Sequence, residues 1–165
     1  MSMANPLAQV LTERLSAIDA GVMAHGFLPH GRDYAIVLED CVGPDPGTYR
    51  LTFTHVVQLD YETRVRDESW KVSWGQEFTS YEDWQRPGEP DGYVWGTNWA
   101  GAYPGFEAPT QSENAREWSH RLGHDMFEMT LETDRFMLRL VFHEVIVDKL
   151  SNDASTVRRV TIPIE

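Results

Sequence analysis

Cysteine is almost absent from this chain of 165 residues, in which Cys41 stands alone. A single cysteine cannot form a disulfide within the chain, so the composition favours a reducing compartment. No apolar run approaches the ~20 residues that a helix needs to span a bilayer, and the opening residues lack the basic and apolar stretches of a secretion signal. Together these absences predict a cytoplasmic protein without a membrane segment.

Basic residues are also scarce. The chain has 14 Lys and Arg against 26 Asp and Glu, which gives a formal net charge of −12. Nucleic acids and anionic membrane surfaces bind basic faces, so this charge argues against both as partners. It is compatible with a basic protein partner, whose approach an acidic field accelerates. Solvated acidic faces that serve solubility alone are the ordinary interpretation of the same charge.

The length and a hydrophobic fraction of 41% predict one domain, 1–165, with a substantial core. Apolar residues at three- and four-residue spacing predict a helix over residues 5–24. Asn5 suits the N-cap of this helix and Pro6 suits its first turn. Gly26 follows as a stop signal.

A second helix is predicted over residues 110–122. Thr110 and Glu113 form a capping-box pattern at its start, and Gly123 follows its last apolar residue. Residues 62–82 fit helical and strand spacing equally well, so both remain open there.

Alternating apolar and polar residues predict at least five strands. They cover residues 34–39, 49–61, 127–132, 136–147 and 157–164. The turn signal at residues 43–47 predicts an antiparallel hairpin between the first two strands. The alternation changes phase across His143 and Glu144, which predicts a β-bulge. The expected fold is α+β, with an antiparallel sheet of about five to seven strands, an N-terminal helix and a second helix near 110–122.

One connection has an unusual composition. All six tryptophans lie between Trp70 and Trp118, and residues 92–106 combine aromatic side chains with glycine and proline. Glycine lets a backbone pass close to a partner, and exposed aromatics anchor protein interfaces or stack on sugars. The predicted binding residues are Tyr93, Trp95, Asn98, Trp99, Tyr103 and Phe106. The alternative is that the connection buries its own aromatics as a satellite core.

The histidines offer a weaker signal for chemistry. His55 and His143 each lie in a predicted strand, and two imidazoles that met there could transfer protons. A core histidine hydrogen-bonded to a hydroxyl or a backbone carbonyl is the ordinary interpretation. Glu117, His120 and His124 would share a face of a continuous helix, as metal ligands do, but Gly123 interrupts that helix. We therefore predict no catalytic residue, no resident metal and no cofactor, and binding rather than an enzyme.

Four short motifs resemble the YxiG-like family of uncharacterised small bacterial proteins. They are Gly-Tyr-Val-Trp-Gly-Thr-Asn-Trp at 92–99, Tyr-Pro-Gly at 103–105, Ala115 with Trp118, and Leu-Val-Phe-His at 140–143. The resemblance covers roughly the second half of the chain. That family has no established activity, so the resemblance assigns no catalytic residue. Some of its members lie among toxin and immunity genes, which implies a toxin-neutralising or other protein-binding role.

The expected function is an acidic, immunity-like interaction domain that binds a basic protein through the aromatic connection and the acidic surface. The alternative is a domain for a small molecule or a carbohydrate, in which Trp95, Trp99 and Tyr103 form a stacking platform. An enzyme that uses His55 and His143 is a third possibility. The oligomeric state is left open.

Overall fold

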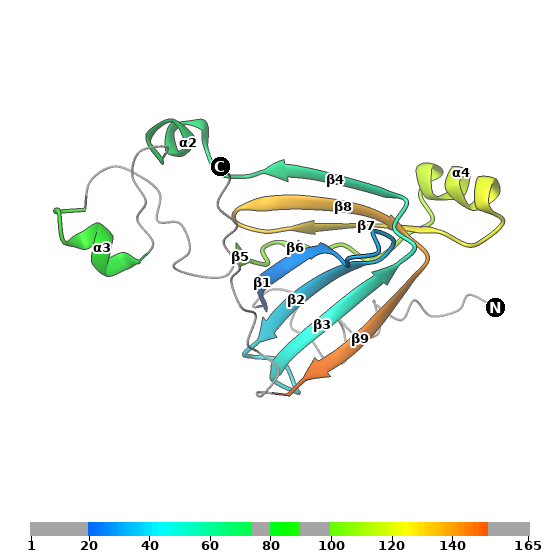
Figure 1. Cartoon of the computed structure of the whole chain (residues 1–165), viewed down its shortest axis with the longest axis horizontal. Coiled ribbons are helices and arrows are strands. Elements are labelled where there is room, and N and C mark those ends of the chain that lie inside the picture. The colour runs from blue at the N-terminus through cyan, green and yellow to red at the C-terminus, as the bar shows by residue number, and fades with distance from the viewer. Residues whose placement is uncertain (1–19, 74–79, 90–99, 152–165) are drawn as a thin grey trace.

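Two antiparallel sheets pack face to face in this protein, with helices at both ends (Figure 1). The computed structural model describes residues 20–73, 80–89 and 100–151. These segments contain nine strands and three helices, so the α+β class and the antiparallel pairing are confirmed. The predicted single sheet of five to seven strands is wrong, because the strands divide into two sheets.

The first sheet has the strand order β5-β1-β2-β3-β9. Its strands are β1 (Ala20–Phe27), β2 (Tyr34–Asp40), β3 (Gly47–Thr54), β5 (Ala100–Gly101) and β9 (Glu144–Leu150). The predicted hairpin is confirmed for β2 and β3, which pair from Tyr34 opposite Phe53 to Asp40 opposite Gly47. This hairpin could be predicted because the glycine and proline residues at 43–47 favour a turn whatever the rest of the chain does.

The second sheet has the order β4-β8-β7-β6. Its strands are β4 (Gln58–Thr63), β6 (Gly105–Phe106), β7 (Phe127–Glu132) and β8 (Phe136–Phe142). A tight turn joins β7 and β8, and the buried hydroxyl of Thr133 organises it. That hydroxyl donates to the carbonyl oxygen of Phe136 and accepts from the N–H groups of Arg135 and Phe136.

Two predicted strands are each divided between the sheets. The strand predicted over 49–61 breaks after Thr54, so that β3 belongs to the first sheet and β4 to the second. The strand predicted over 136–147 breaks at His143, where the chain passes from β8 in the second sheet to β9 in the first. The predicted β-bulge is therefore wrong: the phase changes because the chain changes sheets. A hydrogen bond from the His143 N–H to the Thr54 carbonyl (3.0 Å) joins the two crossings.

The predicted N-terminal helix is wrong for its last five residues, 20–24, which belong to β1. β1 pairs with β2 along its length and with β5 on its other side, for example Val22 with Leu38 and with Ala100. Pairing on both sides outweighs a helical spacing that these residues also fit. The rest of that helix, 5–19, and the strand predicted over 157–164 lie outside the described residues.

Three short helices complete the described chain. α2 (Asp67–Ser73) and α3 (Tyr81–Gln85) fall in or beside the segment whose pattern is ambiguous, and they project from one end of the sandwich (Figure 1). α4 (Glu113–Leu122) lies at the other end. Gly123 ends α4 in a left-handed conformation (φ 70°), as predicted. Its N-cap is Ser112, whose hydroxyl accepts from the Ala115 N–H, rather than the predicted Thr110.

The core lies between the two sheets and consists of alternate residues of their strands. Its fully buried side chains include Ile36, Leu38, Leu51, Phe53, Leu131, Leu138 and Leu140. Phe53 and Phe142 meet edge to face across the sandwich, with ring centroids 4.9 Å apart. Burying each such side chain stabilises the fold by about 1.5–3 kcal/mol. A smaller cluster lies under α4, where Ala115, Met126 and Val141 pack together.

Candidate functional site

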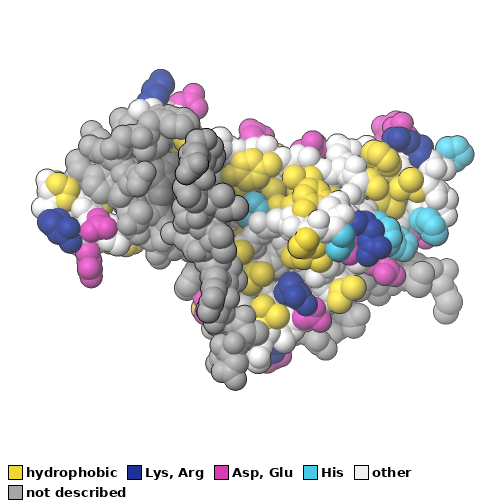
Figure 2. All heavy atoms as spheres, in the orientation of Figure 1, with side chains coloured by type: hydrophobic (Ala, Val, Ile, Leu, Met, Phe, Trp, Pro, Cys, Tyr) yellow, Lys and Arg dark blue, Asp and Glu magenta, His cyan; other side chains and the backbone are white. Residues whose placement is uncertain are grey.

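An aromatic face lies where the inner surfaces of β1 and β4 come to the margin of the sandwich. It consists of His25, Phe27, Tyr34, Tyr61 and Phe136. Tyr61 lies nearly parallel to Phe136, with centroids 5.6 Å apart, and His25 lies 4.6 Å from Phe136. Tyr61 is 56% exposed and Phe27 is 48% exposed, although both are large aromatic side chains. Hydrophobic side chains gather on this side of the molecule in Figure 2.

Strand register explains why these side chains share one face. Phe27 pairs with Tyr34 and His25 with Ile36, which is fully buried, so both point to the inner side of the first sheet. Tyr61 pairs with the buried Leu138 and points to the inner side of the second. β4 is an edge strand of that sheet. At the margin, inward-facing side chains therefore meet solvent instead of an opposing sheet.

The floor of the aromatic face holds one polar pair. The Nδ1 atom of His25 lies 2.5 Å from the hydroxyl oxygen of Tyr34. Burial lowers the pKa of His25 below its ordinary value. Burial, followed by the nearby Tyr61, raises the pKa of Tyr34 to about 12. Both shifts favour the uncharged forms, so at neutral pH the pair presents a hydrogen-bonded but uncharged surface.

Carboxylates border the aromatic face along β4. Asp60 and Glu62 flank Tyr61 and are exposed on the opposite side of the strand. An Arg64 nitrogen lies 3.9 Å from a Glu62 oxygen, a loose and exposed ion pair. Such a pair contributes little to stability, so Glu62 is available to a partner. The border therefore combines a large aromatic ring with acidic neighbours.

The aromatic connection predicted as the binding site is described at its C-terminal end. Tyr103 is 70% exposed and follows β5. Phe106 lies in β6, pairs with Leu131 of β7, and packs against the core. The other predicted contact residues, Tyr93, Trp95, Asn98 and Trp99, lie outside the described residues. The described end of the connection thus presents one aromatic side chain to solvent and packs the other against the core.

A histidine cluster lies at the other end of the sandwich, beside α4. It consists of His55, His124 and His143. The ring centroids of His55 and His143 are 5.9 Å apart, and those of His124 and His143 are 5.8 Å apart. Sequence analysis proposed that His55 and His143 could meet, and they do. It placed His124 with Glu117 and His120, but His124 follows the C-cap of α4 and turns to His143 instead.

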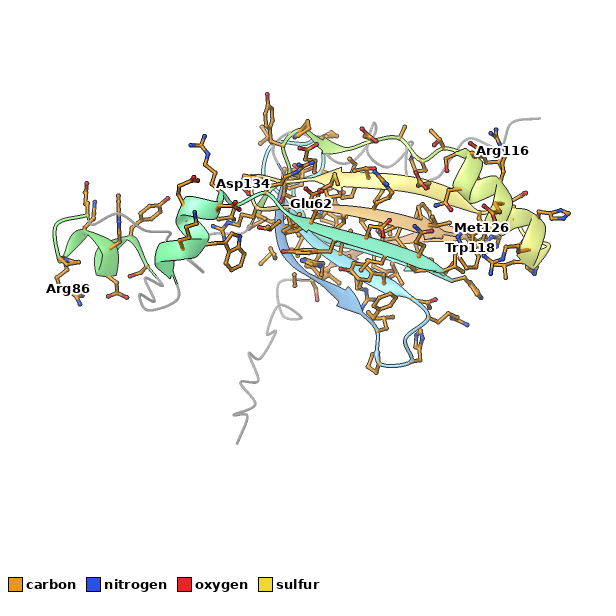
Figure 3. All side chains as sticks on the ribbon, turned by 90° about the horizontal axis from the view of Figure 1, so that it is seen from above. Glu62, Arg86, Arg116, Trp118, Met126 and Asp134 are labelled. Carbon is orange, nitrogen blue, oxygen red and sulfur yellow. The ribbon has the colours of Figure 1, made fainter. Side chains whose placement is uncertain are left out.

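The three imidazoles border a hollow of about 130 Å³, together with Leu122 and Met126. Met126 lies near α4, at the end of the molecule opposite to Glu62 and Asp134 (Figure 3). The histidine cluster and the β4 border of the aromatic face are therefore separate regions. Among residues 20–73, 80–89 and 100–151, no group of three or more His, Cys, Asp or Glu side chains is placed so that it could hold a metal ion as it stands. No helix in these segments has the length and apolarity of a membrane crossing.

Comparison with known families confirms the resemblance seen in the sequence. A family model described as YxiG-like protein matches residues 4–160. The match extends well beyond the second half of the chain that carried the motifs. No curated protein matches the sequence.

Proposed function

The chain belongs to the YxiG-like family, and we propose that it is a protein-interaction domain that binds a basic partner through the aromatic face. The observation that carries this proposal is the exposure of Tyr61 and Phe27 beside acidic residues of β4. Large aromatic side chains at a surface are the usual anchors of protein interfaces. A neutralising, immunity-like role is the form of binding that we propose.

Tyr61 is the proposed anchor. Its ring lies against His25 and Phe136, which hold it in place before a partner arrives. A preordered side chain loses little conformational freedom on binding, so more of the contact energy appears as affinity. The uncharged pair of His25 and Tyr34 beneath it adds no charge that binding would have to desolvate.

Charge supplies the second part of the proposal. The whole chain carries a net charge of −12, and Asp60 and Glu62 flank the anchor in sequence, with their carboxylates on the other side of the edge strand β4. A field of one sign accelerates the approach of an oppositely charged protein and contributes specificity more than affinity. The association rate with the partner should therefore fall as salt concentration rises.

The aromatic connection is proposed as a further contact region. Tyr103 is exposed at its described end, and Tyr93, Trp95, Asn98, Trp99 and Phe106 remain the other proposed contacts. The alternative proposal, a stacking platform of Trp95, Trp99 and Tyr103 for a carbohydrate, uses the same connection. A ligand that depended on Tyr103 and not on Tyr61 would favour the alternative.

The test compares two tyrosines of nearly equal exposure. The full chain would capture its partner from an extract of its own cells, and the purified partner would then be titrated against variants by calorimetry. Tyr61→Ala is expected to weaken binding about 30-fold, because truncating an interface anchor costs about 2 kcal/mol or more. Tyr81→Ala, which changes a 53% exposed tyrosine of α3, should leave the affinity unchanged.

Two results would contradict the proposal. One is a partner that binds Tyr61→Ala as tightly as the unaltered chain. The other is an acidic partner, or one whose association rate does not change between low and high salt. Thermal unfolding of both variants shows that a loss of binding is not a loss of fold.

A further inference from the structure

Three histidines from three different connections meet at the end of the sandwich beside α4, and we propose that they bind a zinc-like divalent transition-metal ion. The ligands would be the imidazoles of His55, His124 and His143, with water in the remaining position. This site is independent of the aromatic face and of the proposed protein partner. Imidazole is the ligand that Zn²⁺, Ni²⁺ and Cu²⁺ share, whereas Mg²⁺ and Ca²⁺ require oxygen ligands.

The two sheet crossings bring His55 and His143 together. His55 follows the last residue of β3, and His143 separates β8 from β9. Two backbone hydrogen bonds fasten the crossings to each other, one from the His143 N–H to the Thr54 carbonyl and one from the Val57 N–H to the Val141 carbonyl, both 3.0 Å. The positions of these two imidazoles are thus fixed by the sheets rather than by a flexible loop.

His143, the central histidine, makes a hydrogen bond of the kind that orients metal-binding histidines. Its Nδ1 atom lies 2.7 Å from the backbone carbonyl oxygen of Asp125. A carbonyl can only accept, so Nδ1 carries the hydrogen and donates it. In the neutral ring the lone pair is then on Nε2. This is the second hydrogen bond that metal-binding histidines usually make, since it fixes both the tautomer and the direction of the ring.

His55 occupies a backbone conformation that residues with a side chain rarely adopt. Its φ is 49°, in the left-handed region. A hydrogen bond from its N–H to the buried carboxylate of Asp33 (3.0 Å) holds it there. Left-handed residues other than glycine are costly and gather at functional sites. The chain thus maintains an unfavourable conformation at the residue that brings an imidazole to the cluster.

The third histidine reaches the cluster because α4 ends early. Gly123 terminates the helix, and His124 follows it beside His143. Leu122 and Met126 complete the wall of the hollow, so its lining is mainly apolar. On the other side of His124 and His143, an open hollow of about 320 Å³ gives water access to the same rings.

Binding an ion requires the two outer, exposed imidazoles to rotate towards His143. Two imidazoles on one tetrahedral zinc ion, with N–Zn of about 2.1 Å, have ring centroids about 5 Å apart. The centroids of His55 and His124 lie 5.9 and 5.8 Å from that of His143, so each outer ring has to approach His143 by about 1 Å and to turn a nitrogen towards a common point. His55 and His124 are exposed and have room for this movement, whereas His143 is held by Asp125.

Calorimetric titration of the full chain with zinc chloride alone tests the assignment. We expect one ion per chain, and no binding of magnesium under the same conditions. His124→Ala and His55→Ala should each weaken zinc binding by at least about tenfold, because each removes a ligand. His124 is exposed, so its variant should unfold at the same temperature as the unaltered chain. Nitrogen chemical shifts should show that zinc binds Nε2 of His143 while Nδ1 keeps its hydrogen.

His120→Ala is the matched control, since His120 is exposed in the last turn of α4 and borders neither hollow. Its zinc affinity should equal that of the unaltered chain. If His120→Ala lost as much affinity as His124→Ala, the ion would bind along the helix and the assignment would be wrong. Absence of zinc binding at millimolar concentration, or an unchanged affinity in His55→Ala, would also overturn it.

Discussion

Replacing Asp33 with alanine should destabilise the crossing between β3 and β4. Asp33 is 6% exposed and accepts from the His55 N–H at 3.0 Å, and from Nε and Nη2 of Arg32 at 2.8 and 2.9 Å. A hydrogen bond to a charged group contributes about 1.5–3 kcal/mol, so Asp33→Ala is expected to cost about 2 kcal/mol. Asp33→Asn keeps an acceptor without the charge and should cost about 1 kcal/mol. Arg32 is 57% exposed, and Arg32→Gln should cost less than either, because solvent weakens its ion pair.

The same carboxylate predicts a dependence on pH. The hydrogen bonds from Arg32 lower the pKa of Asp33 well below its usual range, burial opposes them, and the His55 N–H adds to the lowering. A lowered pKa means that the folded chain prefers the carboxylate, so the stabilisation is complete above the unfolded value of about 3.9. It is lost as pH falls further towards the folded value. The difference between the unaltered chain and Asp33→Asn should therefore be constant from about pH 5 to pH 8 and shrink below about pH 4.

Urea unfolding followed by tryptophan fluorescence measures these differences, provided that the m-value stays the same among variants. The reasoning fails if Arg32→Gln costs as much as Asp33→Ala, because the ion pair and not the His55 amide would then dominate. It also fails if the gap between the unaltered chain and Asp33→Asn persists undiminished at about pH 3.

Substitutions at three more positions give further predictions. Thr133→Val removes the hydroxyl that accepts from two N–H groups in the β7–β8 turn, and it should lower the free energy of unfolding in urea by about 3 kcal/mol. Thr133→Ser keeps that hydroxyl and should lower it by less than about 1 kcal/mol. Phe142→Ala leaves a cavity against Phe53 and should cost about 3–5 kcal/mol in the same assay; a loss below about 1 kcal/mol would mean that the two sheets do not pack there. Burial lowers the pKa of His25, so its contribution is complete above the unfolded value of about 6.5 and is lost as pH falls. The melting temperature should drop less between about pH 7.5 and pH 5.5 in His25→Gln than in the unaltered chain, and equal drops would refute this.

Elements with a signal in their own residues could be predicted from the sequence. The β2–β3 hairpin has a turn of glycine and proline at 43–47, and α4 has a glycine that ends it. The crossing at His55, where the chain passes from β3 in the first sheet to β4 in the second, has no such local signal. Alternation runs through that position unbroken, because the apolar residues of β3 and of β4 both face the interior of the sandwich, although from different sheets. Which sheet a strand joins depends on residues far away in the chain.

The candidate sites divide in the same way. That His55 and His143 could meet was predictable, since each lies within a predicted strand and neighbouring strands would bring them together. That His124 joins them was not, because its neighbours in sequence suggest a helix face. The aromatic face was missed, since Tyr61 alternates like a core residue and Phe27 directly follows the glycine predicted to stop the N-terminal helix. Their exposure results from their place at the margin of the sheets, which no local pattern records.

The order in which the first sheet is synthesised has a consequence for newly made chains. β3 ends at Thr54, but β9, its neighbour on the outer side, begins only at Glu144. At about 5–20 residues per second, roughly 5–20 seconds of synthesis separate them. During that interval the backbone N–H and carbonyl groups that β9 will pair with are open, and an open strand edge is a template for pairing with another chain. Pairing with the seven residues of β9 covers this edge of β3, and β9 then becomes the outer strand of the described sheet.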